Sequence, residues 1–118
     1  MTPQPKHDVD SHFNGRPAVI REIYDALVSE SGKFGPVEED PKKTSIHLNR
    51  KSAFAAVRTR QGYIWLTLKS DTPLEAERVF RSQHASANRW YSEIKLSDPA
   101  DVDIELITWL GKAYNISA

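Results

Sequence analysis

Aromatic and basic side chains alternate along two stretches of this chain that have the composition of β-strands. Tyr63 and Trp65 take alternate positions in the first stretch, and Arg89, Tyr91 and Lys95 take alternate positions in the second. Alternate residues of a strand share one face, so each set would form a row on a sheet. Aromatic rings stack on unpaired bases at about 1–3 kcal/mol each, while Arg and Lys contact phosphates. The same residue types are also enriched in protein–protein interfaces.

We therefore predict a contact surface on the outer face of a sheet. Its candidate residues are Tyr63, Trp65, Tyr91, Arg58, Arg89, Lys95 and His47. Three interpretations stay open: contact with a protein partner or a second copy, binding of single-stranded nucleic acid or a nucleotide, and side chains that are merely covered or solvated. The face of Arg58 depends on the turn at Gln61-Gly62. A two-residue turn places Arg58 beside Trp65, whereas a three-residue turn shifts the register and sends Arg58 to the other face.

The charges of the chain are segregated along its length. Residues 41–95 hold 11 Lys and Arg against four Asp and Glu, although the formal net charge of the whole chain is zero. Residues 1–40 carry a net charge of −4 and residues 96–118 a net charge of −3. A basic middle and acidic ends give the molecule two electrically different sides, which favours a partner of opposite sign. The acidic run Glu38-Glu39-Asp40 would complement the basic sheet of a second copy in a head-to-tail or two-fold dimer.

Two weaker patterns carry residue types used in metal chemistry. Near the N-terminus stand His7, Asp8, Asp10 and His12, which we interpret as a polar segment that caps a turn. Glu93-x-Lys95, with Asp71 after the preceding strand, matches part of a metal-dependent nuclease motif, but a solvated cross-strand pair explains it as well. The chain has neither a nucleophile elbow nor a glycine-rich phosphate loop. We predict no catalytic residues, no metal and no cofactor.

The composition is that of a single globular domain of 118 residues, with 39% hydrophobic and 27% charged residues. We predict a disordered lead-in over residues 1–9 and one domain over residues 10–118. The chain has no cysteine, which favours the cytoplasm. No stretch approaches the roughly 20 apolar residues of a membrane span, and the N-terminus lacks the apolar run of a signal peptide.

Hydrophobic periodicity predicts a helix and then a series of strands. The helix covers Arg16–Ser31, with Pro17 in its first turn and Gly32 as a left-handed cap. Val37–Asp40 is at most a short edge strand because Pro41 follows it. Three strands in an antiparallel meander are then predicted at Thr44–Arg50, Ala53–Thr59 and Tyr63–Lys69.

The last third of the chain predicts a short helix, a strand and a long helix. Thr72-Pro73-Leu74-Glu75 resembles a capping box, so we predict a short helix at Pro73–Ser82. A strand follows at Arg89–Leu96, and Asp98 then caps a helix that opens at Pro99. The predicted buried stripe of that helix is Val102, Leu106, Trp109, Leu110 and Ala113.

These elements predict an α+β fold of order α-β-β-β-(short α)-β-α. The fold is a two-layer sandwich in which an antiparallel meander sheet of four or five strands carries the N-terminal and C-terminal helices on one face.

Four blocks of the chain carry a resemblance to a known family: SHFNGRPAVIREIYDAL, KKTSIHL, AFAAVRTRQGYIWLTL and EIKLSDPADVDIELITWLGKAY. The chain resembles, over about residues 10–114, a bacterial family catalogued as domain of unknown function 5655. Members of that family occur as stand-alone proteins and as C-terminal modules beside nuclease-like domains. The resemblance therefore mildly favours a role connected with nucleic acids. The family has no established activity, so the resemblance implies no catalytic residues. The element order is also similar to that of small frataxin-like α-β sandwiches, an analogy of fold alone.

Overall fold

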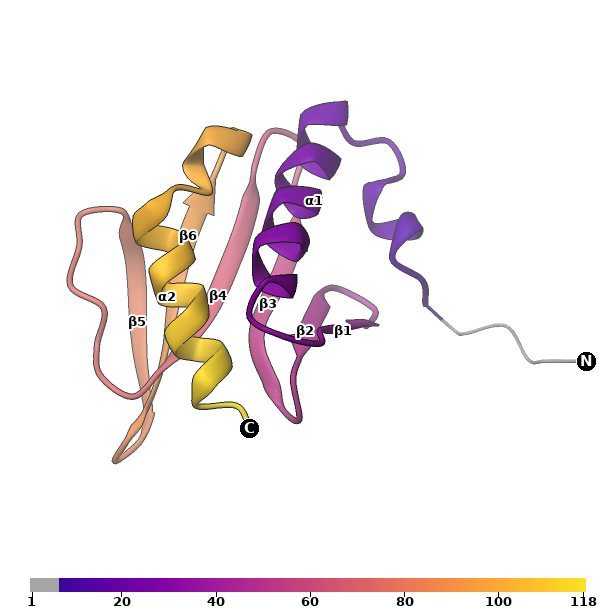
Figure 1. The fold of residues 1–118 in the computed structure, drawn as a ribbon. Helices are drawn as coiled ribbons and strands as arrows, with labels where there is room; N and C mark the ends of the chain where they lie inside the picture. The colour runs from indigo at the N-terminus through magenta and orange to yellow at the C-terminus, as the bar shows by residue number, and fades with distance from the viewer. Residues whose placement is uncertain (1–6) are drawn as a thin grey trace, which may run out of the picture.

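Six antiparallel strands form one sheet in the computed structural model, which describes residues 7–118 (Figure 1). Their spatial order is β1-β2-β3-β4-β6-β5. The strands are β1 (Glu38–Pro41), β2 (Ile46–Asn49), β3 (Ala53–Thr59), β4 (Ile64–Ser70), β5 (Val79–Ser86) and β6 (Arg89–Leu96). The α+β class and the antiparallel sheet predicted from the sequence are confirmed, whereas the predicted number of four or five strands is too low.

The additional strand is β5, and it replaces the short helix predicted at Pro73–Ser82. Residues 71–78 contain no helix, and from Val79 the chain pairs antiparallel with β6. The capping-box signal at Thr72 is local, whereas the free edge of β6 offers β5 a row of backbone hydrogen bonds along most of its length. Pairing of this kind overrides a weak helix propensity. Because β6 lies between β4 and β5, the sheet is not a simple meander.

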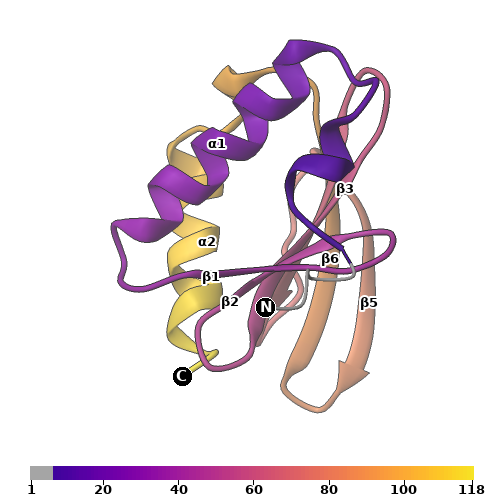
Figure 2. The ribbon, with the colours of Figure 1, turned by 90° about the vertical axis from the view of Figure 1, so that its right-hand side faces the viewer.

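Both long helices, α1 (Ala18–Gly32) and α2 (Ile104–Asn115), pack on the same face of the sheet, as Figures 1 and 2 show. We call this the inner face and the opposite one the outer face. Ile64, Leu66 and Leu68 of β4 have no exposed surface and form the centre of the core. The helices contribute Ile20, Ile23, Tyr24 and Leu27 from α1, and Leu106, Leu110 and Ala113 from α2. The predicted facing of β4 is therefore confirmed.

The helix ends differ from prediction in detail. Gly32 is the last residue of α1 and the next residue, Lys33, has right-handed backbone angles, so Gly32 is not a left-handed cap. The positive φ lies at Gly35 instead (151°). A Cβ atom at Gly35 would stand 2.3 Å from the hydroxyl oxygen of Tyr114, so the close packing of this loop on α2 requires glycine.

The predicted C-terminal helix is two helices. A short 3-10 helix, η2 (Pro99–Asp101), begins after Asp98, and α2 begins after its own cap, Asp103. The Asp101 carboxylate accepts hydrogen bonds from the backbone N–H groups of Ser97 and Asp98, which completes the first cap within one turn. The Asp103 carboxylate then accepts from Leu106 N at 3.0 Å and starts α2.

A second 3-10 helix, η1 (Asp10–Phe13), precedes α1 where the sequence predicted a single turn. Residues 1–6 of the predicted lead-in lie outside the described residues, and Val9 at its end packs against the core. Within residues 7–118, no helix combines the length and the hydropathy that crossing a membrane requires.

Candidate functional site

The register of the sheet places Arg58 on the outer face. Arg58 pairs with Trp65, and Trp65 pairs in turn with Lys95, so the three side chains form one row across β3, β4 and β6. The turn between β3 and β4 has two residues, because Arg60 N donates to Tyr63 O at 2.9 Å around Gln61-Gly62. The sequence left this facing open, and the short turn decides it.

The other candidate residues follow the same alternation. Tyr91 pairs with Lys69 in a second row, and His47 pairs with Ala56 on the β2 side. Arg89 lies two residues before Tyr91 on β6. The structure therefore brings all seven candidates to the outer face, which neither helix covers: Tyr63, Trp65, Tyr91, Arg58, Arg89, Lys95 and His47.

Three aromatic rings gather on this face, and we call them the aromatic ridge: Tyr63, Trp65 and Phe80. The Tyr63 and Trp65 rings meet edge to face with centroids 5.5 Å apart, and the Trp65 and Phe80 centroids are 5.1 Å apart. Phe80 is 64% exposed although its ring is large and apolar. The Lys95 ammonium lies 4.4 Å from the centre of the Tyr63 ring.

Sequence reasoning missed Phe80 because it placed this residue in a short helix. The β-bulge between Val79 and Arg81 gives Phe80 no partner on β6 and brings its ring against Trp65. A strand-like pattern in Val79-Phe80-Arg81 was the only signal in the sequence that could have found it.

Two arginines of the outer face share one carboxylate. Arg58 Nη2 donates to Glu93 Oε1 at 2.8 Å, and Arg81 Nε lies 3.7 Å from Glu93 Oε2. Their positive charge is therefore partly neutralised within the protein, which leaves less of it for a phosphate ligand. Asp71 lies on the helix side of the sheet in a pocket with α2, so it does not join Glu93 and Lys95 as the nuclease motif would require.

A shallow apolar hollow of about 270 Å³ lies beside this row. Ala53 and Ala56 form part of its floor, and His47, Lys69 and Tyr91 stand around it. Lys69 is only 7% exposed, and its ammonium donates to Ser52 Oγ at 2.9 Å. Burial, with a smaller contribution from the Arg89 charge, lowers the pKa of Lys69 below its ordinary value.

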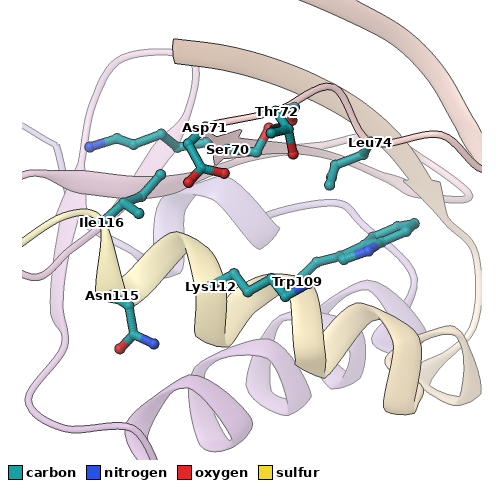
Figure 3. A pocket seen from close by; sticks show the side chains of 9 residues that line it. Ser70, Asp71, Thr72, Leu74, Trp109, Lys112, Asn115 and Ile116 are labelled. Carbon is teal, nitrogen blue, oxygen red and sulfur yellow. Dashed lines mark hydrogen bonds between the residues drawn. The ribbon is translucent and has the colours of Figure 1, made fainter. Parts of the chain in front are cut away.

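A second pocket, of about 350 Å³, lies on the other side of the sheet. Its upper wall is formed by Asp71, Thr72 and Leu74, and its lower wall is α2 (Figure 3). These three residues belong to the segment of residues 71–78, which we call the strap. The lining side chains are both polar and apolar: Lys69, Ser70, Asp71, Thr72, Leu74, Trp109, Lys112, Asn115 and Ile116. No pattern in the sequence predicted this pocket. Trp109, predicted to be buried in the core, is half-buried and lines the pocket.

Arg78 fastens the strap to the start of α2. Its guanidinium donates to Asp103 Oδ1 at 2.8 Å, to Glu105 Oε1 at 3.2 Å and to the backbone oxygen of Asp101 at 2.7 Å. The backbone N–H of Leu106 and the Arg78 guanidinium together lower the pKa of Asp103. The strap is thus held at its end by charge-assisted hydrogen bonds.

Within residues 7–118, no three His, Asp or Glu side chains converge as metal ligands. Three of the four polar residues of the N-terminal cluster have other partners. Asp8 caps Ser11 N at 2.7 Å, Asp10 pairs with Arg21 at 2.8 Å, and His12 Nε2 lies 2.8 Å from Lys42 O. These contacts hold η1 against α1 and the β1–β2 turn.

A family model for a domain of unknown function, number 5655, matches residues 9–117, essentially the whole chain. The chain belongs to this family. The membership confirms the resemblance seen in the four sequence blocks, and the family has no known function. Neither the curated proteins nor the solved structures contain a match to the chain.

Proposed function

We propose that this family member is a protein-interaction module that pairs with a second copy of itself through the outer face of its sheet. The observation that carries the proposal is the aromatic ridge, with the Phe80 ring 64% exposed on a face that neither helix covers. A ring of this size in water is unfavourable, and burying it against a partner recovers that free energy. Exposed aromatics beside arginines are typical of protein interfaces.

The charges of the outer face support a second copy as the partner. At one edge, Glu38 and Asp40 of β1 share the outer face with His47, because Asp40 pairs with His47. At the other end, Arg89 and Lys95 stand on β6. A two-fold axis parallel to the strands would place each acidic edge over the basic half of the other copy. Such an arrangement is self-complementary, as a two-fold dimer requires.

A single-stranded nucleic acid is the second candidate partner, favoured by the exposed rings of Phe80 and Tyr91 near Arg89 and Lys95. The shared carboxylate of Glu93 weighs against it, since Arg58 and Arg81 already have an anionic partner. Glu38 at the β1 edge would also repel phosphates, although its neighbour Asp40 is paired with Lys42 at 2.9 Å. The balance of charge therefore favours a protein surface.

Sedimentation velocity from about 10 μM to about 1 mM tests the proposal. The wild-type chain is expected to shift from monomer to dimer as its concentration rises. Phe80→Ser is expected to raise the dissociation constant of the dimer about tenfold or more. Ile104→Ser is the matched control, because Ile104 is an 80% exposed apolar residue on α2. Glu38→Lys should also weaken the dimer, whereas Glu22→Lys on α1 should not.

A wild-type chain that stays monomeric over this concentration range would contradict self-association. A loss of dimer affinity in Ile104→Ser as large as that in Phe80→Ser would contradict the assignment of the interface to the outer face. A titration of the same protein with mixed-sequence single-stranded DNA at low and moderate salt separates the second candidate. If the chain stays monomeric and binds the DNA in a salt-sensitive way that Phe80→Ser abolishes, the outer face is a nucleic-acid-binding surface and not a dimer interface.

A further inference from the structure

We propose that the pocket between the strap and α2 binds a small zwitterion that carries an aromatic ring, a ligand of the aromatic α-amino acid class. The pocket lies on the helix side of the sheet, so this inference is independent of the outer face. Its volume of about 350 Å³ falls at the small end of the range of small-molecule sites. A ligand of one ring and one charged head group has the matching size.

One end of the pocket is apolar. Leu74 of the strap and the indole of Trp109 on α2 face the cavity from opposite walls (Figure 3). Both side chains are half-buried, so each keeps accessible apolar surface within the pocket. A planar ring between them would contact the indole and cover the exposed part of Leu74.

The other end of the pocket carries charges of opposite sign on its two walls. The Asp71 carboxylate points from the strap toward α2, and Lys112 stands on the helix below it (Figure 3). Within residues 7–118, neither Asp71 nor Lys112 forms an ion pair. The side chain of Lys69, which the pocket shares with the outer face, is already engaged, because its ammonium donates to Ser52 Oγ.

A zwitterion satisfies both charged walls at once. Its ammonium would bind the Asp71 carboxylate on the strap. Its carboxylate would bind Lys112 and accept from the Asn115 amide. A ligand with a single charge would gain one of these contacts and meet a like charge on the other wall.

The pocket wall is held in place before any ligand arrives. Arg78 fastens one end of the strap to the start of α2 by hydrogen bonds to Asp101, Asp103 and Glu105, and Leu74 packs against the core. Near the other end, Ser70 Oγ donates to Thr72 O at 2.6 Å. A preformed site loses little conformational entropy on binding, which favours affinity for a small ligand.

An amide-shift NMR titration of the full chain with L-phenylalanine tests the proposal. Saturable shifts are expected at the Trp109 indole N–H and at the amides of residues 70–74 and 109–116. Three analogues isolate the contacts: phenethylamine lacks the carboxylate, 3-phenylpropionate lacks the ammonium, and L-alanine lacks the ring. Each is expected to bind about tenfold or more weakly than L-phenylalanine.

Two exposed-residue variants assign the charges without disturbing the core. Asp71→Asn should weaken L-phenylalanine and phenethylamine about fivefold or more, and should strengthen 3-phenylpropionate because a like charge is removed. Lys112→Met should weaken L-phenylalanine and 3-phenylpropionate and should strengthen phenethylamine for the same reason. Asp25→Asn and Lys43→Met, which lie outside the pocket, serve as matched controls and should change nothing. The proposal is overturned if L-phenylalanine gives no saturable shifts, if an analogue with one charge binds equally well, or if Asp71→Asn leaves every affinity unchanged.

Discussion

The two faces of the same six strands differ in side-chain chemistry and in what covers them. On β4, the inner residues Ile64, Leu66 and Leu68 are aliphatic and fully buried beneath the two helices. The alternate residues Trp65 and Thr67 are half-buried on a face that neither helix covers. One face of β4 thus stabilises the fold by burial, and its other face is available for contacts. Both are possible in one strand because successive side chains point to opposite faces of the sheet.

The largest expected difference between the faces is the loss of stability when a side chain at the centre of the inner face is truncated. Leu66→Ala should lower the free energy of unfolding by about 2–5 kcal/mol, because it removes fully buried methyl groups and leaves a cavity. Thr67→Ala, on the next residue and the other face, should cost about 0.5–1 kcal/mol. Urea denaturation of both variants measures the comparison, and similar losses at the two positions would show that the outer face is packed as tightly as the core.

A smaller effect is expected where the strap meets the helix layer. Arg78→Gln removes hydrogen bonds to Asp103, Glu105 and the backbone oxygen of Asp101, and should cost about 1–2 kcal/mol because part of this network is exposed. Hydrogen exchange of the strap amides should accelerate in this variant while the amides of β4 keep their protection.

The Arg78 effect should also depend on pH. The folded-state pKa of Asp103 lies below its ordinary value of 3.8, so the stability that Asp103 contributes is present above that value and is lost as the pH falls through the folded-state pKa. The difference between wild type and Arg78→Gln should therefore shrink between about pH 5 and pH 2. A difference that stays constant over this range would show that the ion pair does not stabilise the fold.

The smallest effect is expected at Lys69, the charged residue of the outer face that is nevertheless buried. Its ammonium has a hydroxyl as its partner in Ser52, so Lys69→Met should raise the free energy of unfolding by about 0.5–1 kcal/mol at neutral pH. The exposed Lys51→Met is the matched control and should change little. A loss of stability in Lys69→Met would mean that the hydrogen bond outweighs the cost of burying the charge.

The stability difference between Lys69→Met and wild type should also depend on pH. Because burial lowers the pKa of Lys69 in the folded state, the cost of the buried charge is present at neutral pH and is relieved as the pH rises through that lowered pKa toward 10.5. The advantage of Lys69→Met should therefore diminish with rising pH in thermal melts.

Much of the sheet could be predicted from the sequence because its signals are local. The bounds of β3 and β6 agree with those predicted, Ala53–Thr59 and Arg89–Leu96, since period-two alternation marks them directly. Pro41 correctly limited β1 to a short edge strand, and Asp98 correctly marked a helix start. The outer-face placement of the seven candidate residues followed from the same alternation, apart from Arg58, whose facing needed the turn length.

β5 and the features that depend on it could not be predicted in this way. The Thr72-Pro73 signal indicates a helix within four residues, but the stabilisation of β5 comes from β6, which follows it in the chain. The exposure of Phe80 depends on that pairing and on its bulge. The ion pairs of Glu93 likewise join residues on three different strands.

The sequence by itself determined the alternation of aliphatic and polar residues, the caps and the class of the fold, because each of these depends on residues within one turn or one strand. Only the tertiary structure decided how many strands there are, where the charges of the outer face are paired, and that the strap and α2 enclose a pocket. Residues 70–74 and 109–116 are far apart in the chain, and their meeting depends on how the whole core packs, which no local pattern encodes.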